Sequence, residues 1–261
     1  MNHPKAIRTL LDISLLAGEA ILNIYNSPDA LANQSKEDGS PLTLADLASN
    51  KVIIEHLKKN WPEIPIISEE GKSLSYEKRK SWNQFWLVDP LDGTKEFIKR
   101  NGEFTTNIAL IENGLPVLGV VHAPALKLTY YGSSQLGSFK MKGSEAIQIF
   151  SQEKDPMTGL KIVESRSHSV ELPESLLSKI KITERVPSGS SIKLCLVADG
   201  SADIYPRLAP TMEWDVAAGD AVYRFSGKNS PRKSNLTYNK ETLKNDSFIL
   251  GLKEGVWNAD H

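Results

Sequence analysis

Apolar residues near the N-terminus recur at steps of three, four and seven. They are Ile7, Leu10, Leu11, Leu15, Ile21, Leu22 and Tyr25. This spacing places them on one face of an α-helix, so it predicts an amphipathic opening helix that ends at Asn26-Ser27-Pro28. The polar, turn-rich residues 34–41 predict a loop or loose hairpin. A second helix is predicted from Thr43 to Trp61, because apolar positions return at helical spacing and Pro62 follows.

Short apolar runs bounded by turn residues follow the second helix and predict strands. The first two are separated by the polar connection Lys72–Asn83. Asn113-Gly114 separates the next two, and Asn-Gly between apolar runs is typical of a β-hairpin. The later runs therefore predict an antiparallel meander. The predicted strands are residues 64–67, 85–88, 107–111, 116–121, 128–131 and 138–141.

The pattern changes after residues 151–159, which are rich in polar and turn-forming residues. Beyond them, short strands alternate with helices. We therefore expect an N-terminal domain of helices and antiparallel sheet at 1–153 and a C-terminal α/β domain at 160–261. Together these elements predict a layered α+β fold. The later predicted helices are 174–180, 192–198 and 215–222, and the extended segments are 161–163, 182–186, 202–205 and 248–250.

The composition is that of an ordinary globular protein. The 261 residues have a net charge of −1, which offers no general basic field for nucleic acid, so a nucleotide would have to be held locally. Cys195 is the only cysteine, which excludes an internal disulfide and fits a reducing cytosol. Residues 1–7 lack the apolar core of a signal peptide. No apolar run approaches the about 18 residues of a membrane span, so we expect a cytoplasmic protein; peripheral membrane contact stays open.

The main chemical signal follows the strand predicted at 85–88, in the sequence Asp89-Pro90-Leu91-Asp92-Gly93-Thr94. Asp89 and Asp92 would repel each other unless a cation lies between them. Hard divalent cations prefer carboxylates, backbone carbonyls and water as ligands. Pro90 helps to end the strand, and Gly93 permits a sharp turn or the close approach of a ligand. We interpret the sequence as a Mg²⁺ site followed by a phosphate seat; the alternative is an acidic turn that caps the next helix.

Two further acidic positions allow the same interpretation. Glu69-Glu70 follows the strand predicted at 64–67, and one of these carboxylates could ligate a metal or orient water. The alternative is a solvated acidic turn. Asp215 precedes a helix rich in alanine and glycine, where it could cap the helix, point into a cleft from the second domain, or do both.

Asp46 also allows two interpretations. Thr43-x-x-Asp46 fits a capping box, which is the default interpretation. Alternatively, Asp46 accepts a hydrogen bond from the hydroxyl of Thr94, whose oxygen then holds an attacking water. A carboxylate–hydroxyl–water relay of this kind is general base chemistry.

Together, these motifs resemble the inositol monophosphatase superfamily of Mg²⁺-dependent, lithium-sensitive phosphatases. The motifs span nearly the whole chain: Glu69-Glu70, Asp89-Pro90-Leu91-Asp92-Gly93-Thr94 and Trp214-Asp215-x-x-Ala218-Gly219. Others favour the bisphosphate nucleotidase branch: Lys95-Glu96-Phe97, Gly189-Ser190-Ser191-x-Lys193 and Ala202-Asp203-Ile204-Tyr205-Pro206-Arg207. Inositol monophosphatases usually carry a small residue and asparagine where Lys95-Glu96 stands. The resemblance implies a layered α/β/α/β/α sandwich.

The resemblance also implies roles for individual residues. Two or three Mg²⁺ ions would be held by Glu69, Asp89, the Leu91 carbonyl, Asp92 and Asp215, with Asp38 completing a weaker site. Thr94 and Asp46 match the water-activating pair, with Glu70 nearby. The N–H groups of Gly93 and Thr94 would bind the scissile phosphate where a helix begins. Further substrate contacts near the metals are expected from Glu69, Leu91, Asp92, Lys95 and Asp215.

A second phosphate would need donors and cations of its own. The candidates are Ser165, Arg166, Ser167, His168, Ser190, Ser191, Lys193 and Arg207. The alternative for each is a solvated surface loop. For Lys193 the alternative is a charge on an exposed helix face, and His168 could equally be a surface histidine.

The reaction implied by the resemblance is hydrolysis of adenosine 3′,5′-bisphosphate to AMP and phosphate, in sulfur assimilation. The sulfated nucleotide 3′-phosphoadenosine 5′-phosphosulfate is a second candidate substrate. Positioning and charge stabilisation by metal ions would suffice, so no nucleophilic side chain is needed. The alternatives are an inositol or sugar phosphatase of the same fold and a non-catalytic nucleotide-binding module. A monomer or homodimer is expected, and contact with the cytoplasmic face of the inner membrane stays open.

Overall fold

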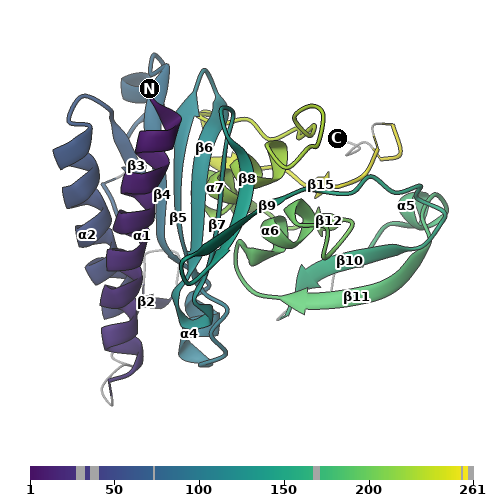
Figure 1. Cartoon of the computed structure of the whole chain (residues 1–261), viewed down its shortest axis with the longest axis horizontal. Coiled ribbons are helices and arrows are strands. Elements are labelled where there is room, and N and C mark those ends of the chain that lie inside the picture. Colours follow the sequence, from purple (N-terminus) through teal and green to yellow (C-terminus); the bar gives the residue numbers. More distant parts are fainter. Residues whose placement is uncertain (28–32, 36–40, 73, 167–170, 254, 258–261) are drawn as a thin grey trace.

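The structure is a computed structural model that describes residues 1–27, 33–35, 41–72, 74–166, 171–253 and 255–257. Its layers run across Figure 1 as long helices, a large sheet, further helices and then small sheets. The layered α+β class predicted from the sequence is therefore confirmed.

The elements are bounded as follows. The helices are α1 (His3–Tyr25), α2 (Leu44–Asn60), α3 (Tyr76–Arg79), α4 (Thr94–Ile98), α5 (Glu174–Leu177), α6 (Ile192–Ala198) and α7 (Glu213–Arg224), with a 3₁₀ turn, η1 (Pro124–Leu126). The strands of the large sheet are β3 (Ile66–Ser68), β4 (Gln84–Asp92), β5 (Thr105–Glu112), β6 (Leu115–Ala123), β7 (Leu128–Ser133), β8 (Gly137–Lys142) and β9 (Glu145–Ile149). The remaining strands are β1 (Asn33–Ser35), β2 (Pro41–Thr43), β10 (Leu160–Ser165), β11 (Ile182–Ser188), β12 (Tyr205–Arg207), β13 (Thr211–Met212), β14 (Lys244–Asn245) and β15 (Phe248–Leu250).

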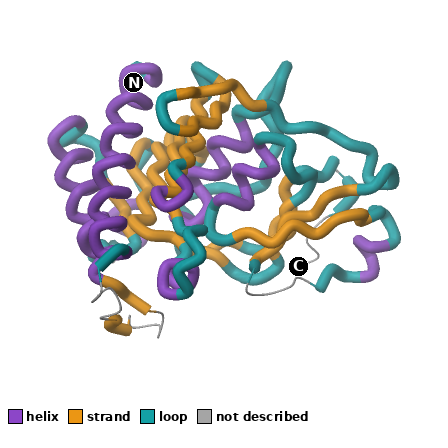
Figure 2. The backbone as a smooth tube through the Cα atoms, turned by 60° about the horizontal axis from the view of Figure 1, so that its bottom comes forward, coloured by secondary structure: helices purple, strands orange, loops and turns teal. Residues whose placement is uncertain are grey.

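The large sheet has its strands in sequence order from β3 to β9. β3 and β4 are parallel, and each later neighbouring pair is antiparallel. Helices α1 and α2 cover one face, and α7 covers the other, where it packs against β5, β6 and β7. Figure 2 shows the same arrangement, with helices on both sides of the strands. Such a sheet is buried on both faces, so its central strands are apolar runs.

The side chains of β4 alternate between these two faces. Trp86 and Val88 join the core beneath α1 and α2. Phe85 and Leu87 join the core on the α7 side. Both cores exclude water, which explains why the sequence Phe85-Trp86-Leu87-Val88 has no polar position. β4 is thereby fixed through the middle of the molecule, and its end delivers Asp89 and Asp92.

Helix α7 lies very close to the sheet. A Cβ atom added at Gly119 of β6 would lie 2.7 Å from the Ala218 carbonyl oxygen and 2.9 Å from the Ala221 Cβ. Only glycine fits at that separation. The small residues of α7 therefore allow it to pack tightly against β6.

The C-terminal part adds two small sheets. β10 and β11 pair in parallel, and β12 pairs with β15 in antiparallel fashion. The core on the α7 side contains Val163 and Leu194 from this part together with Phe85 and Leu87. One core thus extends past residues 153–160, and the division into domains at 1–153 and 160–261 stays a prediction.

Some elements differ from those predicted. The predicted connection 72–83 contains α3, the predicted helix 174–180 is regular only over α5, and β12 begins at the end of the segment 202–205. β9 was not predicted, because residues 145–148 are all exposed and show no apolar alternation. The expected loose hairpin agrees with the pairing of β1 and β2.

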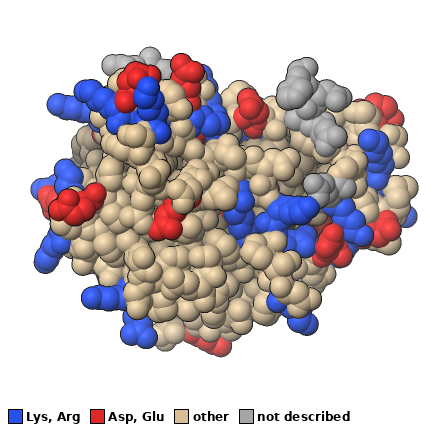
Figure 3. Space-filling view, turned by 90° about the horizontal axis from the view of Figure 1, so that it is seen from above, with Lys and Arg blue, Asp and Glu red and all other residues tan. Residues whose placement is uncertain are grey.

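In the described part of the chain, no helix is long and apolar enough to cross a membrane. On the face drawn in Figure 3, acidic and basic side chains lie among each other. That face therefore carries no extended field of one sign.

Candidate active site

The candidate site begins where β4 ends. Asp89 pairs with Asn107 and Asp92 with Thr105, so β4 has one residue more than β5 across this stretch. The extra residue is a β-bulge, which re-aims side chains relative to a regular strand. The Leu91 amide donates to Asp89 Oδ1 at 3.1 Å, and this bond fixes the buried Asp89 carboxyl.

Gly93 then turns the chain into α4. Its φ is 89°, in the left-handed region that favours glycine, and Thr94 is the first residue of the helix. Its neighbours are close, since a Cβ there would lie 3.2 Å from Ser190 Cβ. The predicted helix start at Thr94 is confirmed, and it places Gly93 beside the turn that carries Ser190.

Four carboxyl groups from three parts of the chain gather near Asp89. Burial is the main cause that raises the pKa of Asp89 well above its ordinary value, and the charges of Glu69, Asp92 and Asp215 raise it further. Glu69 also shares a side-chain hydrogen bond with Asp89. The Glu69 amide donates to the Val88 carbonyl at 3.1 Å, so Glu69 continues the pairing of β3 with β4. Glu70 follows and is partly buried.

Asp215 enters this group from α7. It is the third residue of the helix and not its N-cap, which corrects the predicted position. Its Oδ2 still accepts from the Met212 amide at 2.9 Å, so it caps the first turn from within. Burial and the nearby Asp92 raise the pKa of Asp215 well above its ordinary value. The cap and cleft interpretations are therefore compatible.

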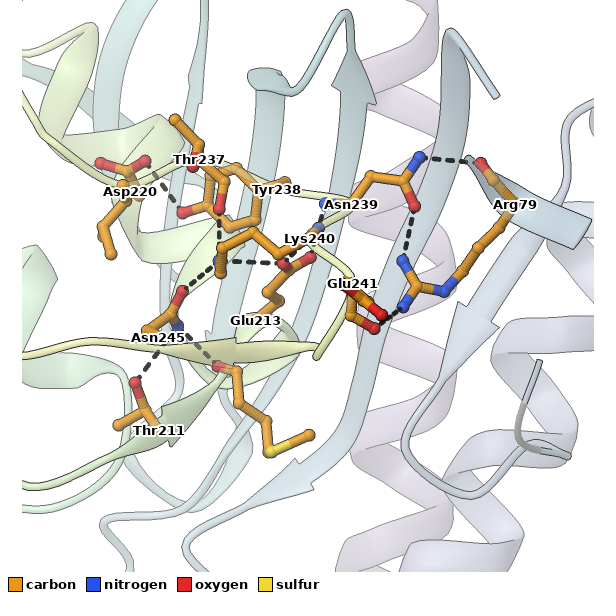
Figure 4. A network of polar contacts seen from close by, with 12 residues as sticks. Arg79, Thr211, Glu213, Asp220, Thr237, Tyr238, Asn239, Lys240, Glu241 and Asn245 are labelled. Atoms are coloured by element: carbon orange, nitrogen blue, oxygen red, sulfur yellow. Dashed lines mark hydrogen bonds and ion pairs between the residues drawn. The ribbon is translucent and has the colours of Figure 1, made fainter. Parts of the chain in front are cut away.

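The first turn of α7 is itself held by a buried polar network (Figure 4). Fully buried Glu213 accepts from the amides of Asn239 and Lys240 at 2.8 and 3.0 Å, and Lys240 Nζ lies 2.9 Å from Glu213 Oε1. Asn239 Oδ1 accepts from Arg79 Nη1 at 2.8 Å, and the side-chain Nδ2 of Asn239 donates to the Arg79 carbonyl at 2.8 Å. The network ties α3, residues 237–241 and the helix that carries Asp215 to one another.

The capping box of Asp46 is confirmed. Asp46 Oδ2 accepts from the Thr43 amide at 2.8 Å and from the Thr43 hydroxyl at 2.5 Å. Helix α4, which begins with Thr94, packs against β2, which ends at Thr43. The two elements are neighbours, while the hydrogen bond between Asp46 and Thr94 stays a prediction.

A cavity of about 210 Å³ opens beside this cluster of carboxyl groups. Of the predicted site residues, it is lined by Asp92, Gly93, Lys95, Ser165, Ser190, Ser191, Lys193, Arg207 and Asp215. The lining residues not predicted as contacts are Glu96, Leu194, Tyr205, Thr211 and Val216. Acidic and basic side chains from both parts of the chain therefore face one cavity.

Lys193 supplies a buried cation to this cavity. It is 6% exposed, so the alternative of a charge on an exposed helix face is wrong. Its Nζ donates to the Ser190 carbonyl at 2.6 Å and lies 5.7 Å from the centre of the Tyr205 ring. Burial lowers the pKa of Lys193 to about 8, against the charge of Asp92, which raises it. Arg207 also lines the cavity, and its buried Nε has no hydrogen-bond partner in the part of the chain that the structure describes.

Ser191 connects the two sides of the cavity. Its hydroxyl lies 2.8 Å from Asp92 Oδ2 and 2.6 Å from the Asp215 carbonyl oxygen. The side-chain amide of Asn107 donates to it at 2.9 Å. Asn107 and Thr105 were not predicted to belong to the site. Their position was informative, because buried polar residues at the start of an otherwise apolar strand need hydrogen-bond partners.

Three predicted residues cannot be placed, and Arg166 does not belong to the cavity. Asp38, Ser167 and His168 lie outside the described residues. Arg166 is exposed and pairs with Glu103, and it does not line the cavity.

The donor set fits a hard divalent cation in its chemistry. Carboxylates raise one another's pKa values when no cation separates them, as at Asp89 and Asp215. Within the described residues, however, no three His, Cys, Asp or Glu side chains are already arranged to hold a metal ion. A cation bound between Asp89 and Glu69 would replace the hydrogen bond that they share.

The sequence model of the Inositol monophosphatase family matches residues 6–233, and the chain belongs to this family. The resemblance predicted from the motifs is thus confirmed. The chain is 47% identical over 206 residues to the 3′(2′),5′-bisphosphate nucleotidase CysQ of Salmonella typhimurium, which covers 79% of this chain and 82% of the relative. It is 44% identical over 211 residues to CysQ of Escherichia coli K12, which covers 81% of this chain and 84% of the relative.

Solved structures show the same relationship. CysQ from Bacteroides thetaiotaomicron, described as a bacterial member of the inositol monophosphatase family, superposes with a TM-score of 0.75 at 42% identity and covers 94% of this chain and 96% of that one. The Thermotoga maritima IMPase TM1415 has a TM-score of 0.72 at 21% identity, covering 94% of this chain and 91% of its own. At that identity the second likeness shows a shared fold.

Proposed function

We propose that this chain is a Mg²⁺-dependent 3′(2′),5′-bisphosphate nucleotidase that hydrolyses adenosine 3′,5′-bisphosphate to AMP and phosphate. One observation carries the proposal: Asp92 and Asp215 line the same cavity as the cations Lys193 and Arg207. A substrate with two phosphates needs both kinds of environment, a metal-binding side for the reacting group and a cationic side for the other. The names of the relatives with 44% and 47% identity support the same activity.

The metal-binding side is proposed to consist of Glu69, Asp89, the Leu91 carbonyl, Asp92 and Asp215. Asp38 would complete a weaker site. Bound Mg²⁺ would supply Lewis-acid stabilisation of the phosphoryl oxygens and lower the pKa of water. The burial of Asp89 excludes bulk water and strengthens these electrostatic interactions.

The chain's own residues are proposed to position the reacting phosphate. The amides of Gly93 and Thr94, at the start of α4, would donate to its oxygens. The Thr94 hydroxyl would hold the attacking water and pass its proton toward Asp46, with Glu70 nearby. Phosphoryl transfer depends mainly on such positioning and charge stabilisation, so no covalent intermediate with the protein is needed.

The second phosphate is proposed to lie against the cationic wall. That wall consists of the cavity residues Lys193, Arg207, Ser190, Ser191, Lys95 and Ser165. His168, which lies outside the described residues, is a further candidate. Charge-assisted hydrogen bonds to phosphate are stronger than those between neutral groups. Because Asp92 and Asp215 line the same cavity as these residues, one substrate can contact both groups.

The wider role is also a proposal. 3′-phosphoadenosine 5′-phosphosulfate carries the same 3′-phosphate and would be a second substrate, which places the enzyme in sulfur assimilation. We further propose a cytoplasmic monomer or homodimer.

A substrate panel tests the proposal. Phosphate release is measured for adenosine 3′,5′-bisphosphate, 3′-AMP and inositol 1-phosphate, with Mg²⁺ and again after chelation. The bisphosphate should be hydrolysed fastest and only with the metal present. Faster hydrolysis of inositol 1-phosphate would favour a sugar or inositol phosphatase, and no Mg²⁺-dependent release from any ester would favour a non-catalytic binding module.

Lithium inhibition is a separate expectation of the same proposal. Millimolar lithium should reduce phosphate release from adenosine 3′,5′-bisphosphate, with sodium at equal concentration as the control. Equal rates in the two salts would count against a site of the proposed kind.

A further inference from the structure

Glu103 lies outside the cavity but contacts the turn that carries the cationic wall. It is located between α4 and β5, in the N-terminal part of the chain. Its Oε2 accepts from the Gly189 amide at 2.8 Å. The same carboxylate pairs with Arg166 through Nε at 2.8 Å and Nη2 at 2.6 Å. Bidentate pairs of this kind are the strongest and most directional that arginine forms.

Arg166 holds the same turn from the other side. Its Nη2 also donates to the Pro187 carbonyl at 3.1 Å, and its own amide donates to the Ser188 carbonyl at 3.3 Å. Glu103 and Arg166 together therefore bind three consecutive residues, Pro187, Ser188 and Gly189. The pair joins β10 and the end of β11 to the segment that precedes β5.

The turn held in this way is crowded and strained. A Cβ atom at Gly189 would lie 2.7 Å from the Glu103 carbonyl oxygen and 2.8 Å from Glu96 Cγ. Ser190 has a φ of 41°, although it is not glycine. A buried residue in this conformation costs free energy and persists only when its surroundings fix it. The Ser190 carbonyl in turn accepts from Lys193 Nζ at 2.6 Å.

We propose that Glu103 is a positioning residue that holds the turn Gly189-Ser190-Ser191 so that Ser190 and Lys193 face the second phosphate of the substrate. The inference rests on the proposed bisphosphate nucleotidase function. Glu103 acts through the Gly189 amide and Arg166, and it touches no reacting atom. Without it, the strained turn would relax, and the Lys193 ammonium would lose its fixed partner at the Ser190 carbonyl.

The chain offers a matched control for the variant. Glu164 on β10 pairs with Arg185 on β11 at 2.6 Å, with side-chain exposures of 12% and 42%. The pair of Glu103 and Arg166 has the same distance and exposures of 18% and 43%. Glu164→Gln thus removes an ion pair of similar exposure that, within the described residues, has no hydrogen bond to residues 189–193, and its effect measures the loss of a surface charge alone.

The experiment compares substrates with and without the second phosphate. For Glu103→Ala we expect KM for adenosine 3′,5′-bisphosphate to rise about tenfold, equivalent to about 1.4 kcal/mol, with kcat nearly unchanged. KM for 3′-AMP should change much less. Glu103→Gln should have an intermediate effect, because its amide oxygen can still accept from Gly189 while the ionic pair with Arg166 is lost. Glu164→Gln should match wild type on both substrates.

A binding measurement separates this proposal from the proposed function. AMP keeps the second phosphate and lacks the scissile one, so its Kd by calorimetry does not depend on turnover. Glu103→Ala should weaken AMP binding about tenfold and leave adenosine binding unchanged. Equal losses on bisphosphate and 3′-AMP, or unchanged AMP binding in a folded variant, would overturn the role of Glu103. Wild-type protein that hydrolyses no bisphosphate would instead refute the proposed function, and this inference with it.

Discussion

At the scale of single residues, the site depends on charges that are buried at a cost. Lys193 is nearly inaccessible, and burial lowers its pKa to about 8. Asp89 is the opposite case, since burial and neighbouring carboxylates raise its pKa. A cation bound among the carboxylates would reduce the free-energy cost of the buried Asp89 charge, and an anion beside Lys193 would reduce that of the buried ammonium. The two residues thus favour binding of a cation and an anion together.

The protonation of Lys193 predicts a pH dependence. Below about pH 8 the ammonium is charged and can bind phosphate; above it, the proton is lost. We therefore expect kcat/KM for adenosine 3′,5′-bisphosphate to fall as the pH rises through about 8. Lys193→Met should lower kcat/KM about 10- to 100-fold at pH 7 and abolish the fall of kcat/KM around pH 8. If kcat/KM of the variant still falls around pH 8, another group is responsible for the fall.

Asp89→Asn tests the carboxylate cluster. A raised carboxyl pKa destabilises the folded protein as the pH rises above 3.8, the ordinary value, because the unfolded chain ionises more easily. Metal-free Asp89→Asn should therefore have a higher Tm than wild type near pH 7. Mg²⁺ should raise the Tm of wild type more than that of the variant, and the variant should lose nearly all turnover.

Asp92→Asn removes another ligand charge, so Mg²⁺ should also raise its Tm less than that of wild type, and it should also lose nearly all turnover. Scanning calorimetry with and without Mg²⁺ measures the Tm of both variants. Equal stabilisation by Mg²⁺ in wild type and the two variants would contradict the assignment of Asp89 and Asp92 as ligands.

At the scale of elements, the network of Figure 4 fixes the start of α7. Asn239 is central to it, with its side chain bonded to Arg79 and its amide bonded to Glu213. Its φ of 70° lies in the left-handed region, which asparagine tolerates better than most residues. Position and conformation therefore both select asparagine.

Substitutions of Asn239 separate these two contributions. Asn239→Gly loses the side-chain hydrogen bonds but keeps the backbone unstrained. Asn239→Ala loses the same bonds and adds a left-handed penalty, so it should be less stable than Asn239→Gly by about 1 kcal/mol. Urea unfolding measures the difference. Equal stability of the two variants would show that the backbone relaxes at this position.

The elements also show where sequence patterns were informative. The helix from Thr43 was predictable because its capping box is a local signal, and β4 because it is a continuous apolar run. The cluster of Glu69, Asp89, Asp92 and Asp215 was predicted only by combining motifs through the family resemblance. Glu103 was missed because its partners, Gly189 and Arg166, are distant in sequence, and an isolated glutamate carries no local signal of a contact.

At the scale of the whole molecule, the core joins both parts of the chain. Phe85 and Leu87 of β4 share one core with Val163, Leu194 and residues of α7. Burying apolar surface across such a junction couples the folding of both sides. The site lies at this junction, so its geometry depends on the two parts being folded together.

This coupling predicts a single cooperative unfolding transition. Scanning calorimetry of the full chain should give one peak, with calorimetric and van't Hoff enthalpies that agree. Two resolved transitions would show that the proposed domains, 1–153 and 160–261, are stable independently. Substitution of Leu194 by alanine should shift the whole peak to lower temperature by removing about 2–5 kcal/mol.

The bulge in β4 limits which changes of chain length the family can accept. Removing one residue between Asp89 and Asp92 would restore regular pairing with β5 and abolish the bulge, and with it the local bend that aims the two carboxyl groups. By contrast, the turn at Gly143 between β8 and β9 has open space around it. Insertions such as tags or fused peptides belong at that turn, and natural deletions in β4 should be absent from active relatives.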